Sequence, residues 1–381
     1  MSEFDTIIDR RNTGSLKWER YAGRDVLPLW VADMDFAVPD CVLDAVRSRL
    51  DHGILGYSVA HQGVRVAITD YLTDEHGVAA DPDWLVFTPG MVPAKSQAVL
   101  VAGGPGDALM VCTPAYPPFL NLHRATQREL ITVPLREMPD GPLRYTLDFE
   151  AMEAAVTERT KVFFLCNPHN PVGRVFTAEE VQKVAEFCLA HDLLLVSDEI
   201  HCDLLLEPET TPHYTALRVP GAIQERLIVL MAASKTCNIP GLSTAFAVIP
   251  DGTLRRKFQA SKNTFIAEVN PLGYHATEAA YRFSRPWRQR LQAYLRGNRD
   301  RLASFLAEQA PMVRMPHMEA TYLAWLDVRA LNLENPQSHF EKHGLGFSPG
   351  ADFGGPGHVR LNFGCPRSTL DEALRRFATA I

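Results

Sequence analysis

Residues 161–198 carry the sequence KVFFLCNPHNPVGRVFTAEEVQKVAEFCLAHDLLLVSD, and this stretch decides the fold. Its two ends, residues 161–166 and 193–197, are apolar at successive positions, which is typical of strands buried on both faces. Between them, Thr177 offers a helix cap, and two acidic residues and apolar residues at helical spacing follow it. The stretch therefore predicts a strand, a helix and a second strand of a parallel sheet covered by helices.

The same alternation continues on both sides of this stretch. Further strand-like runs fall at residues 85–88, 108–112, 130–133, 227–232 and 245–249. Together the runs predict an α/β fold with a large, doubly wound, mostly parallel sheet of seven strands.

The pattern changes near residue 270. Helix formers dominate residues 270–310, with Pro286 interrupting them, and short strands (320–326 and 358–363) and a final helix (370–380) follow. These features predict a smaller α+β domain. We expect an N-terminal segment over residues 1–45 that packs with the small domain, a large domain over 46–270 and the small C-terminal domain over 271–381.

Composition excludes several classes of protein. The 381 residues include 38 Lys and Arg against 45 Asp and Glu, a net charge of −7, so nucleic acid is not an expected partner. No apolar run approaches the length of a membrane span, and the first residues lack the features of a signal peptide. Seven cysteines without a C-x-x-C pair favour a reducing cytoplasm. The histidines show no metal-ligand spacing, and His339 and His343 are expected on one helix face, so no metal site is expected.

Polar side chains fall where three predicted strands end. Asn167 and Asn170 follow one strand, Asp198 follows the next, and Ser234 and Lys235 follow a third. Because the carboxyl ends of parallel strands share one edge of a sheet, an amide, a carboxylate and an amine are expected to converge there. This trio suits pyridoxal phosphate, which needs a lysine for its aldehyde and an acid for its ring nitrogen. The amide can donate a hydrogen bond to the ring oxygen.

Three motifs carry a resemblance to a known family. Residues 167–173 (NPHNPVG), 198–201 (DEIH) and 234–241 (SKTCNIPG) resemble the signatures of fold-type-I pyridoxal-phosphate enzymes of the class I/II aminotransferase superfamily. Residues 29–36 (LWVADMDF), 198–203 (DEIHCD) and 360–366 (RLNFGCP) resemble its MalY/PatB-like subgroup of cystathionine β-lyases, or C–S lyases. The likeness covers essentially the whole chain.

The resemblance implies roles for individual residues. Lys235 would attach the cofactor aldehyde and move the proton at Cα of the substrate, Asp198 would pair with the ring nitrogen, and Asn170 would bind the ring oxygen. The cofactor phosphate would be held by Ser234 and by backbone amides at a helix start, namely Met91 and Val92. Tyr116 matches the aromatic residue that stacks on the ring. Tyr57 matches a tyrosine that reaches the phosphate of the neighbouring subunit, which implies a homodimer.

Other positions concern the substrate or depart from the family pattern. Arg360 matches the clamp for the substrate carboxylate, and the amide of Ala32 would assist it. His201 stands where many aminotransferases have a tyrosine and could bind the ring oxygen or a neighbouring group. Ser243, eight residues after Lys235, stands where many relatives have a cationic phosphate partner. Lys95 or Lys262 could compensate, and the sequence does not choose between them.

The implied chemistry leaves more than one reaction open. After the Cα proton is removed, a thiolate leaving group at Cβ gives β-elimination to a thiol, pyruvate and ammonia, whereas reprotonation on the cofactor gives transamination. The subgroup resemblance favours a lyase acting on L-cystathionine or related cysteine S-conjugates, and thus amino-acid metabolism and methionine biosynthesis. The alternative is an aminotransferase. A third candidate, a non-catalytic regulator that retains the fold, lacks the DNA-binding domain it would need to act alone as a transcription factor.

Overall fold

The computed structural model describes residues 2–138, 143–262 and 266–381. Its main feature is a seven-stranded sheet with the strand order β2-β10-β9-β8-β7-β3-β4. β10 is antiparallel to both of its neighbours, and the other adjacent pairs are parallel. The strands are β2 (Leu85–Thr88), β3 (Ala108–Thr113), β4 (Glu129–Pro134), β7 (Thr160–Cys166), β8 (Leu194–Asp198), β9 (Leu227–Met231) and β10 (Ala245–Val248). The expected fold class is confirmed.

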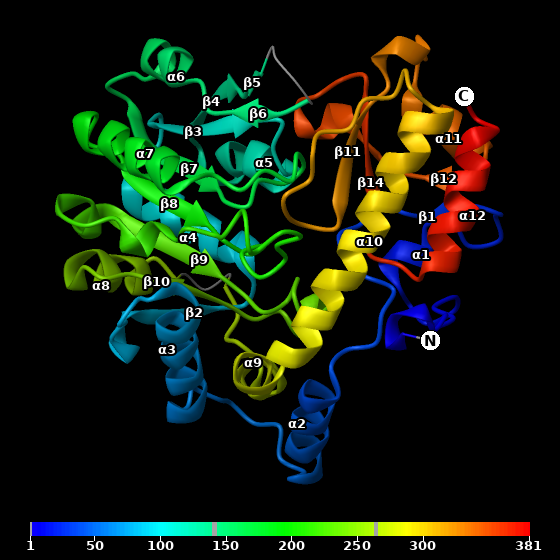
Figure 1. Ribbon diagram of the computed structural model, residues 1–381. Coiled ribbons are helices and arrows are strands. Elements are labelled where there is room, and N and C mark those ends of the chain that lie inside the picture. Colours follow the sequence, from blue (N-terminus) through cyan, green and yellow to red (C-terminus); the bar gives the residue numbers. More distant parts are fainter. Residues whose placement is uncertain (1, 139–142, 263–265) are drawn as a thin grey trace.

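Helices cover both faces of this sheet (Figure 1). Alternate strand residues face opposite clusters: Phe163 belongs to one hydrophobic cluster and Phe164 to the other. The first face packs against α3 (Gln62–His76), α6 (Phe149–Ala155) and α7 (Ala178–Ala190). The second packs against α4 (Met91–Ala102), α5 (Pro117–Thr126) and α8 (Gly252–Ala260). Burial on both faces explains why the strands are apolar at successive positions.

The C-terminal part is built on two helices and a small sheet. The helices are α9 (Pro271–Phe283) and the long α10 (Arg285–Gln309). α9 ends and α10 begins at Ser284. Pro286 lies in the first turn of α10, where its missing N–H group costs no helical hydrogen bond, so it marks the start of this helix. The sheet has the order β11-β14-β13. Its strands and the neighbouring elements are β11 (Leu323–Asp327), α11 (Pro336–Lys342), β12 (Leu345–Gly346), β13 (Ser348–Pro349), β14 (His358–Asn362) and α12 (Arg367–Ala378).

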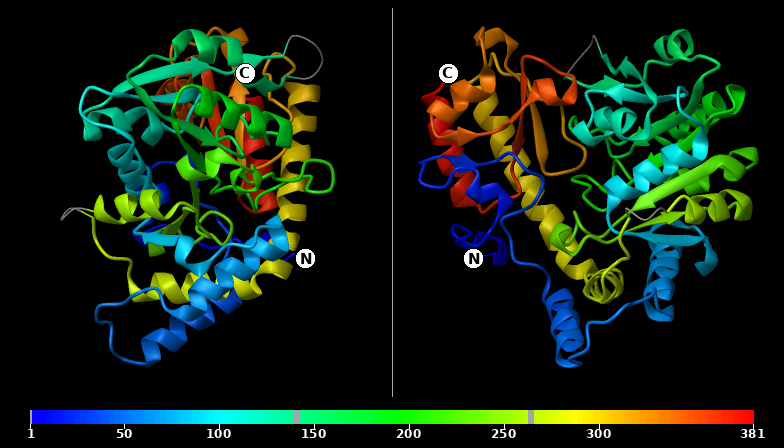
Figure 2. Two further views of the ribbon diagram at one scale, coloured as in Figure 1. Left: turned by 90° about the vertical axis from the view of Figure 1, so that its left-hand side faces the viewer. Right: turned by 180° about the vertical axis from the view of Figure 1, so that it is seen from behind.

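The N-terminal segment, in dark blue, lies against the C-terminal part, in orange and red (Figures 1 and 2). β1 (Leu27–Pro28) pairs in parallel with β12, and Phe4, Leu29 and Phe36 belong to the same hydrophobic cluster as the C-terminal helices. The N-terminal segment also includes α1 (Leu16–Glu19). α2 (Asp40–Asp51) projects from the body and packs on α9. The expected boundary at residue 45 falls inside α2, and the division into domains stays a prediction.

The remaining strands, β5 (Arg136–Glu137) and β6 (Tyr145–Thr146), form a short antiparallel pair. In the part of the chain that the structure describes, every helix is too short or too polar to cross a membrane.

Candidate active site

The ends of β7, β8 and β9 meet at a pocket of about 260 Å³. Nine of the residues predicted from the sequence line it: Ala32, Met91, Val92, Tyr116, Asn170, Asp198, His201, Ser234 and Lys235. Arg360 and Tyr57 are not among its lining residues. The carboxyl edge of the sheet therefore does bring the amide, the carboxylate and the amine together.

Lys235 lies in the turn that follows β9, and its amine points across the pocket to the N-terminal segment. Nζ donates to the carbonyl oxygen of Ala32 at 2.7 Å. Burial, followed by the nearby charge of Arg360, lowers the pKa of Lys235 to about 8. A much larger share of this amine is therefore neutral near pH 7 than of an ordinary lysine.

Asp198 is the last residue of β8, and its carboxylate is already engaged. Oδ1 accepts from the amide of Ile200 at 3.2 Å, and Oδ2 lies 2.7 Å from Nζ of Lys95. Both side chains of this ion pair are only 2% exposed. The sequence analysis considered Lys95 as a phosphate partner and missed this contact. The available signal was its place in α4, one helical turn after Met91.

The start of α4 fits an anion. Gly90 precedes the helix with a φ of 107°, a conformation that favours glycine, and no side chain caps the helix. The first amide groups, those of Met91 and Val92, line the pocket together with Ser243 and Thr244. Lys262 pairs with Glu268 and does not line the pocket.

Arg360 comes from β14 and lies against the other side of Asn170. One guanidinium nitrogen donates to Oδ1 of Asn170 at 3.0 Å and the other to the carbonyl of Trp30 at 2.9 Å. Its Nε is buried without a hydrogen-bond partner, and among the described residues no carboxylate lies within 4.0 Å of the group. Burial lowers its pKa only to about 10, so the group stays cationic at neutral pH. A buried cation with no anion is suited to an acidic ligand.

The loop over residues 30–34 is held by side chains from distant parts of the chain. Each of its five successive carbonyl groups accepts at least one hydrogen bond from a side chain. The donors are Ser348 and Arg360 to Trp30, Asn362 to Val31 and Asp33, Lys235 and Tyr322 to Ala32, Lys17 to Asp33, and Arg10 and Asn238 to Met34. The loop over residues 30–34 is thus held in place, and Ala32 within it lines the pocket.

Tyr116 and His201 line the pocket from different elements. Tyr116 precedes α5. His201 is buried, its Nδ1 has no hydrogen-bond partner, and burial followed by the charge of Lys235 lowers its pKa well below the usual value. His201 is therefore a neutral imidazole at pH 7.

Tyr57 does not join the pocket of its own chain. It lies between α2 and α3, and its side chain is fully exposed. Ile54 and Val59 in the same segment are also mostly exposed, at 65% and 79%. Its predicted place beside a neighbouring subunit's phosphate stays a prediction.

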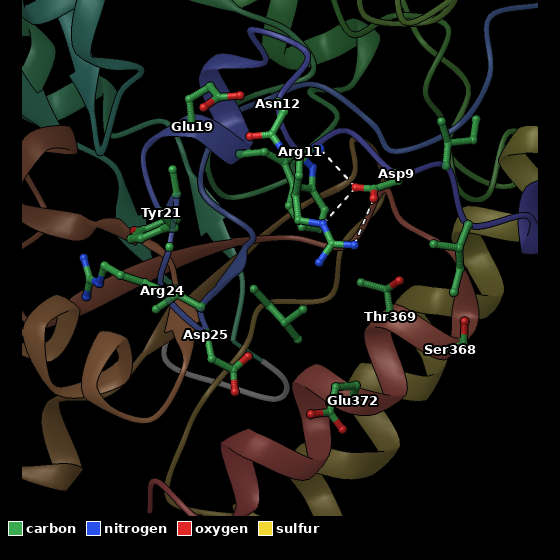
Figure 3. A pocket seen from close by; sticks show the side chains of 17 residues that line it. Asp9, Arg11, Asn12, Glu19, Tyr21, Arg24, Asp25, Ser368, Thr369 and Glu372 are labelled. Carbon is green, nitrogen blue, oxygen red and sulfur yellow. Dashed lines mark hydrogen bonds and ion pairs between the residues drawn. The ribbon is translucent and has the colours of Figure 1, made fainter.

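Three further features lie away from this pocket. Figure 3 shows a larger pocket, of about 570 Å³, between the N-terminal segment and α12, in which Arg11 pairs with Asp9.

His61, His275 and Glu278 place possible metal-ligand atoms within 4.8 Å of one another, which their sequence spacing did not indicate. Nδ1 of His61 already accepts the amide of Val64, and we propose no metal there. The ring of His339 faces the carbonyl of Ala380.

The comparison with known proteins agrees with this fold and pocket. A family model for aminotransferases of class I and II matches residues 24–377, and the chain belongs to that family. Within the family, the chain is 37% identical to cystathionine β-lyase PatB of Bacillus subtilis (strain 168), with 99% of each chain covered.

Solved structures give the same result. The crystal structure of OvoB has a TM-score of 0.95 and 40% identity, with 99% of this chain and 98% of that chain covered. Cystalysin from Treponema denticola, which contains pyridoxal 5′-phosphate, has a TM-score of 0.94 and 32% identity over 100% of this chain and 98% of that chain. Curated relatives named as aminotransferases are 24–26% identical, and a solved structure titled a putative aminotransferase, from Clostridium difficile 630, is 35% identical with a TM-score of 0.93 over 99% of each chain.

Proposed function

We propose that this protein is a pyridoxal-phosphate-dependent C–S β-lyase that cleaves L-cystathionine or related cysteine S-conjugates to a thiol, pyruvate and ammonia. The observation that carries the proposal is the pocket in which Lys235 and Asp198 meet, in a chain whose full-length relatives include named cystathionine β-lyases. The aminotransferase alternative has weaker support, because the curated relatives of that name are 24–26% identical, against 30–37% for those named cystathionine β-lyase.

The residues of the pocket fit the cofactor. Lys235 would hold its aldehyde, Asp198 its ring nitrogen and Asn170 its ring oxygen, while Tyr116 would stack on the ring. The uncapped start of α4, with Ser234 beside it, would take the phosphate. The orphaned Nδ1 of His201 is a further polar atom that faces a pocket without a partner in the protein. When bound, the cofactor supplies a sink for the negative charge left at Cα.

The side chains of this protein would then hold the substrate and move the proton. The guanidinium of Arg360 binds the α-carboxylate, with the amide of Ala32 assisting. Nζ of Lys235 would take the proton from Cα of the substrate. The carbonyl of Ala32, which holds Nζ at 2.7 Å, keeps this amine on the side of the substrate clamp. Loss of the thiolate from Cβ completes the elimination.

We also propose that the active unit is a homodimer in which Tyr57 binds the phosphate of the partner subunit. The support is a fully exposed tyrosine in an apolar segment that projects from the body. Sedimentation velocity should give the mass of two chains, and Tyr57→Phe should weaken cofactor binding. A monomer with full cofactor affinity would contradict this proposal.

A product assay tests the reaction. Purified protein with L-cystathionine should release a thiol and pyruvate without any keto acid, and L-alanine with 2-oxoglutarate should give little product. Lys235→Ala should lose the visible absorbance of the attached cofactor. A requirement for a keto-acid acceptor would instead support the aminotransferase. A wild-type protein without cofactor absorbance would support the non-catalytic regulator. Methionine biosynthesis as the pathway, and the cytoplasm as the location, stay predictions.

A further inference from the structure

The buried ion pair of Lys95 and Asp198 has no place in the roles assigned above. Nζ of Lys95 lies 2.7 Å from Oδ2 of Asp198 and 3.8 Å from the ring centre of Phe119. Among the described residues, Asp198 is the one carboxylate within 4.0 Å of this amine.

The carboxylate of Asp198 is the group on which the proposed cofactor depends. One of its oxygens is bound to the Ile200 amide and the other to Lys95. A carboxylate accepts about four hydrogen bonds, so the ring nitrogen can still bind, but it shares the group with a resident cation. A positive charge at this range disfavours a second positive charge on a neighbouring group.

We propose that Lys95 is a positioning residue that competes with the cofactor ring nitrogen for Asp198. Before the cofactor binds, Lys95 holds the buried carboxylate in place through their 2.7 Å contact. Afterwards it stays within the site and weakens the hold of Asp198 on the ring proton. This inference rests on the proposed function, and it assigns to Lys95 a role at the ring in place of one at the phosphate.

Lys95→Met removes the charge and keeps an unbranched apolar side chain. It leaves Asp198 buried and unpaired in the apoenzyme, and the cofactor ring then becomes its only cationic partner. We therefore expect the melting temperature of the apoenzyme to fall. The difference in melting temperature between holoenzyme and apoenzyme should become larger by several degrees. In holoenzyme with ¹⁵N-labelled cofactor, the ring-nitrogen resonance should move toward the protonated position, equivalent to a pKa of the ring higher by about 1 unit.

Arg299→Met is the control, because Arg299 is also buried, lies 2.8 Å from a carboxylate, that of Glu207, and belongs to α10 outside the pocket. It should lower both melting temperatures by a similar amount and leave the ring resonance unchanged. Lys95→Gln, which keeps a donor without the charge, should act in the same direction as Lys95→Met if the latter folds poorly.

Two results would overturn the inference. If neither the difference between the two melting temperatures nor the ¹⁵N resonance of the cofactor ring changes, Lys95 only packs against Phe119. Weaker binding of the cofactor and of inorganic phosphate would place Lys95 at the phosphate. A wild-type protein that shows no cofactor absorbance would instead refute the proposed function.

Discussion

Replacing Arg360 by lysine tests the substrate clamp directly. The change keeps a positive charge and removes the planar fork that can bind both oxygens of a carboxylate. In the structure, one terminal nitrogen of this guanidinium donates a hydrogen bond to Asn170 and the other donates one to the carbonyl of Trp30. Among the described residues it has no carboxylate partner. The remaining N–H groups are free for the substrate.

The size of the effect follows from the bonds that are lost. A hydrogen bond to a charged group contributes about 1.5–3 kcal/mol, and lysine can replace at most one of the two bonds of a bidentate pair. We expect kcat/KM for L-cystathionine to fall about 10- to 150-fold, with most of the change in KM. The visible absorbance of the bound cofactor should change little.

The assay follows pyruvate release, and two controls separate the clamp from a structural effect. Arg329→Lys changes a half-exposed arginine of the same region, which pairs with Asp327, and should keep full activity. Binding of cystamine, an amine without a carboxylate, should be equal in wild type and Arg360→Lys. If kcat/KM stays within about twofold of wild type, or if cystamine binding falls in parallel, Arg360 does not hold the carboxylate.

Two other expectations concern pH and stability. The pKa of Lys235 is lowered to about 8, so the neutral form of its amine increases as the pH rises through that value. The rate of cofactor attachment to the apoenzyme, measured by stopped-flow absorbance, should therefore rise with pH and level off above about pH 8 to 9. A rate that still increases near pH 10 would contradict this expectation. Glu319 is buried and accepts from Arg174 and from the amide of Val175, at 2.9 and 2.7 Å, while Arg174 also pairs with Glu180. Glu319→Gln should therefore lower the free energy of unfolding by about 1.5–3 kcal/mol in urea titrations. The control Glu129→Gln breaks an exposed ion pair with Arg159 and should cost under about 1 kcal/mol, and equal losses would refute the argument.

Much of the fold was predictable because the central strands β3, β7, β8, β9 and β10 are buried on both faces, whereas the edge strand β4 is partly exposed. Such a strand can be recognised from its own residues alone, without knowing which strands lie next to it. The apolar run from Val162 to Leu165 is an example, because its residues face both hydrophobic clusters in turn. This pattern does not reveal direction: β10 is as apolar as its neighbours although it runs antiparallel to them.

The site was predictable where a residue stands at a strand end, because topology then brings it to a common edge. Asp198, Asn170 and Lys235 were found in this way. The partner of Asp198 was not, because Lys95 lies on a helix and the contact depends on how that helix packs on the sheet. Tyr322, which shares the carbonyl of Ala32 with Lys235, lies in the C-terminal part of the chain and has no signal of its own.

The anchoring of residues 30–34 sets the order of events during synthesis. Asn362 binds the carbonyl of Val31 across 331 positions of sequence, and at about 5–20 residues per second the two are made roughly 20 to 60 s apart. Until then, this loop lacks the donors that the C-terminal part supplies, which are Tyr322, Ser348, Arg360 and Asn362. The nascent chain can form most of its large sheet first, whereas a closed pocket requires nearly the whole polypeptide. Cofactor loading should therefore follow release from the ribosome and should depend on the C-terminal strand.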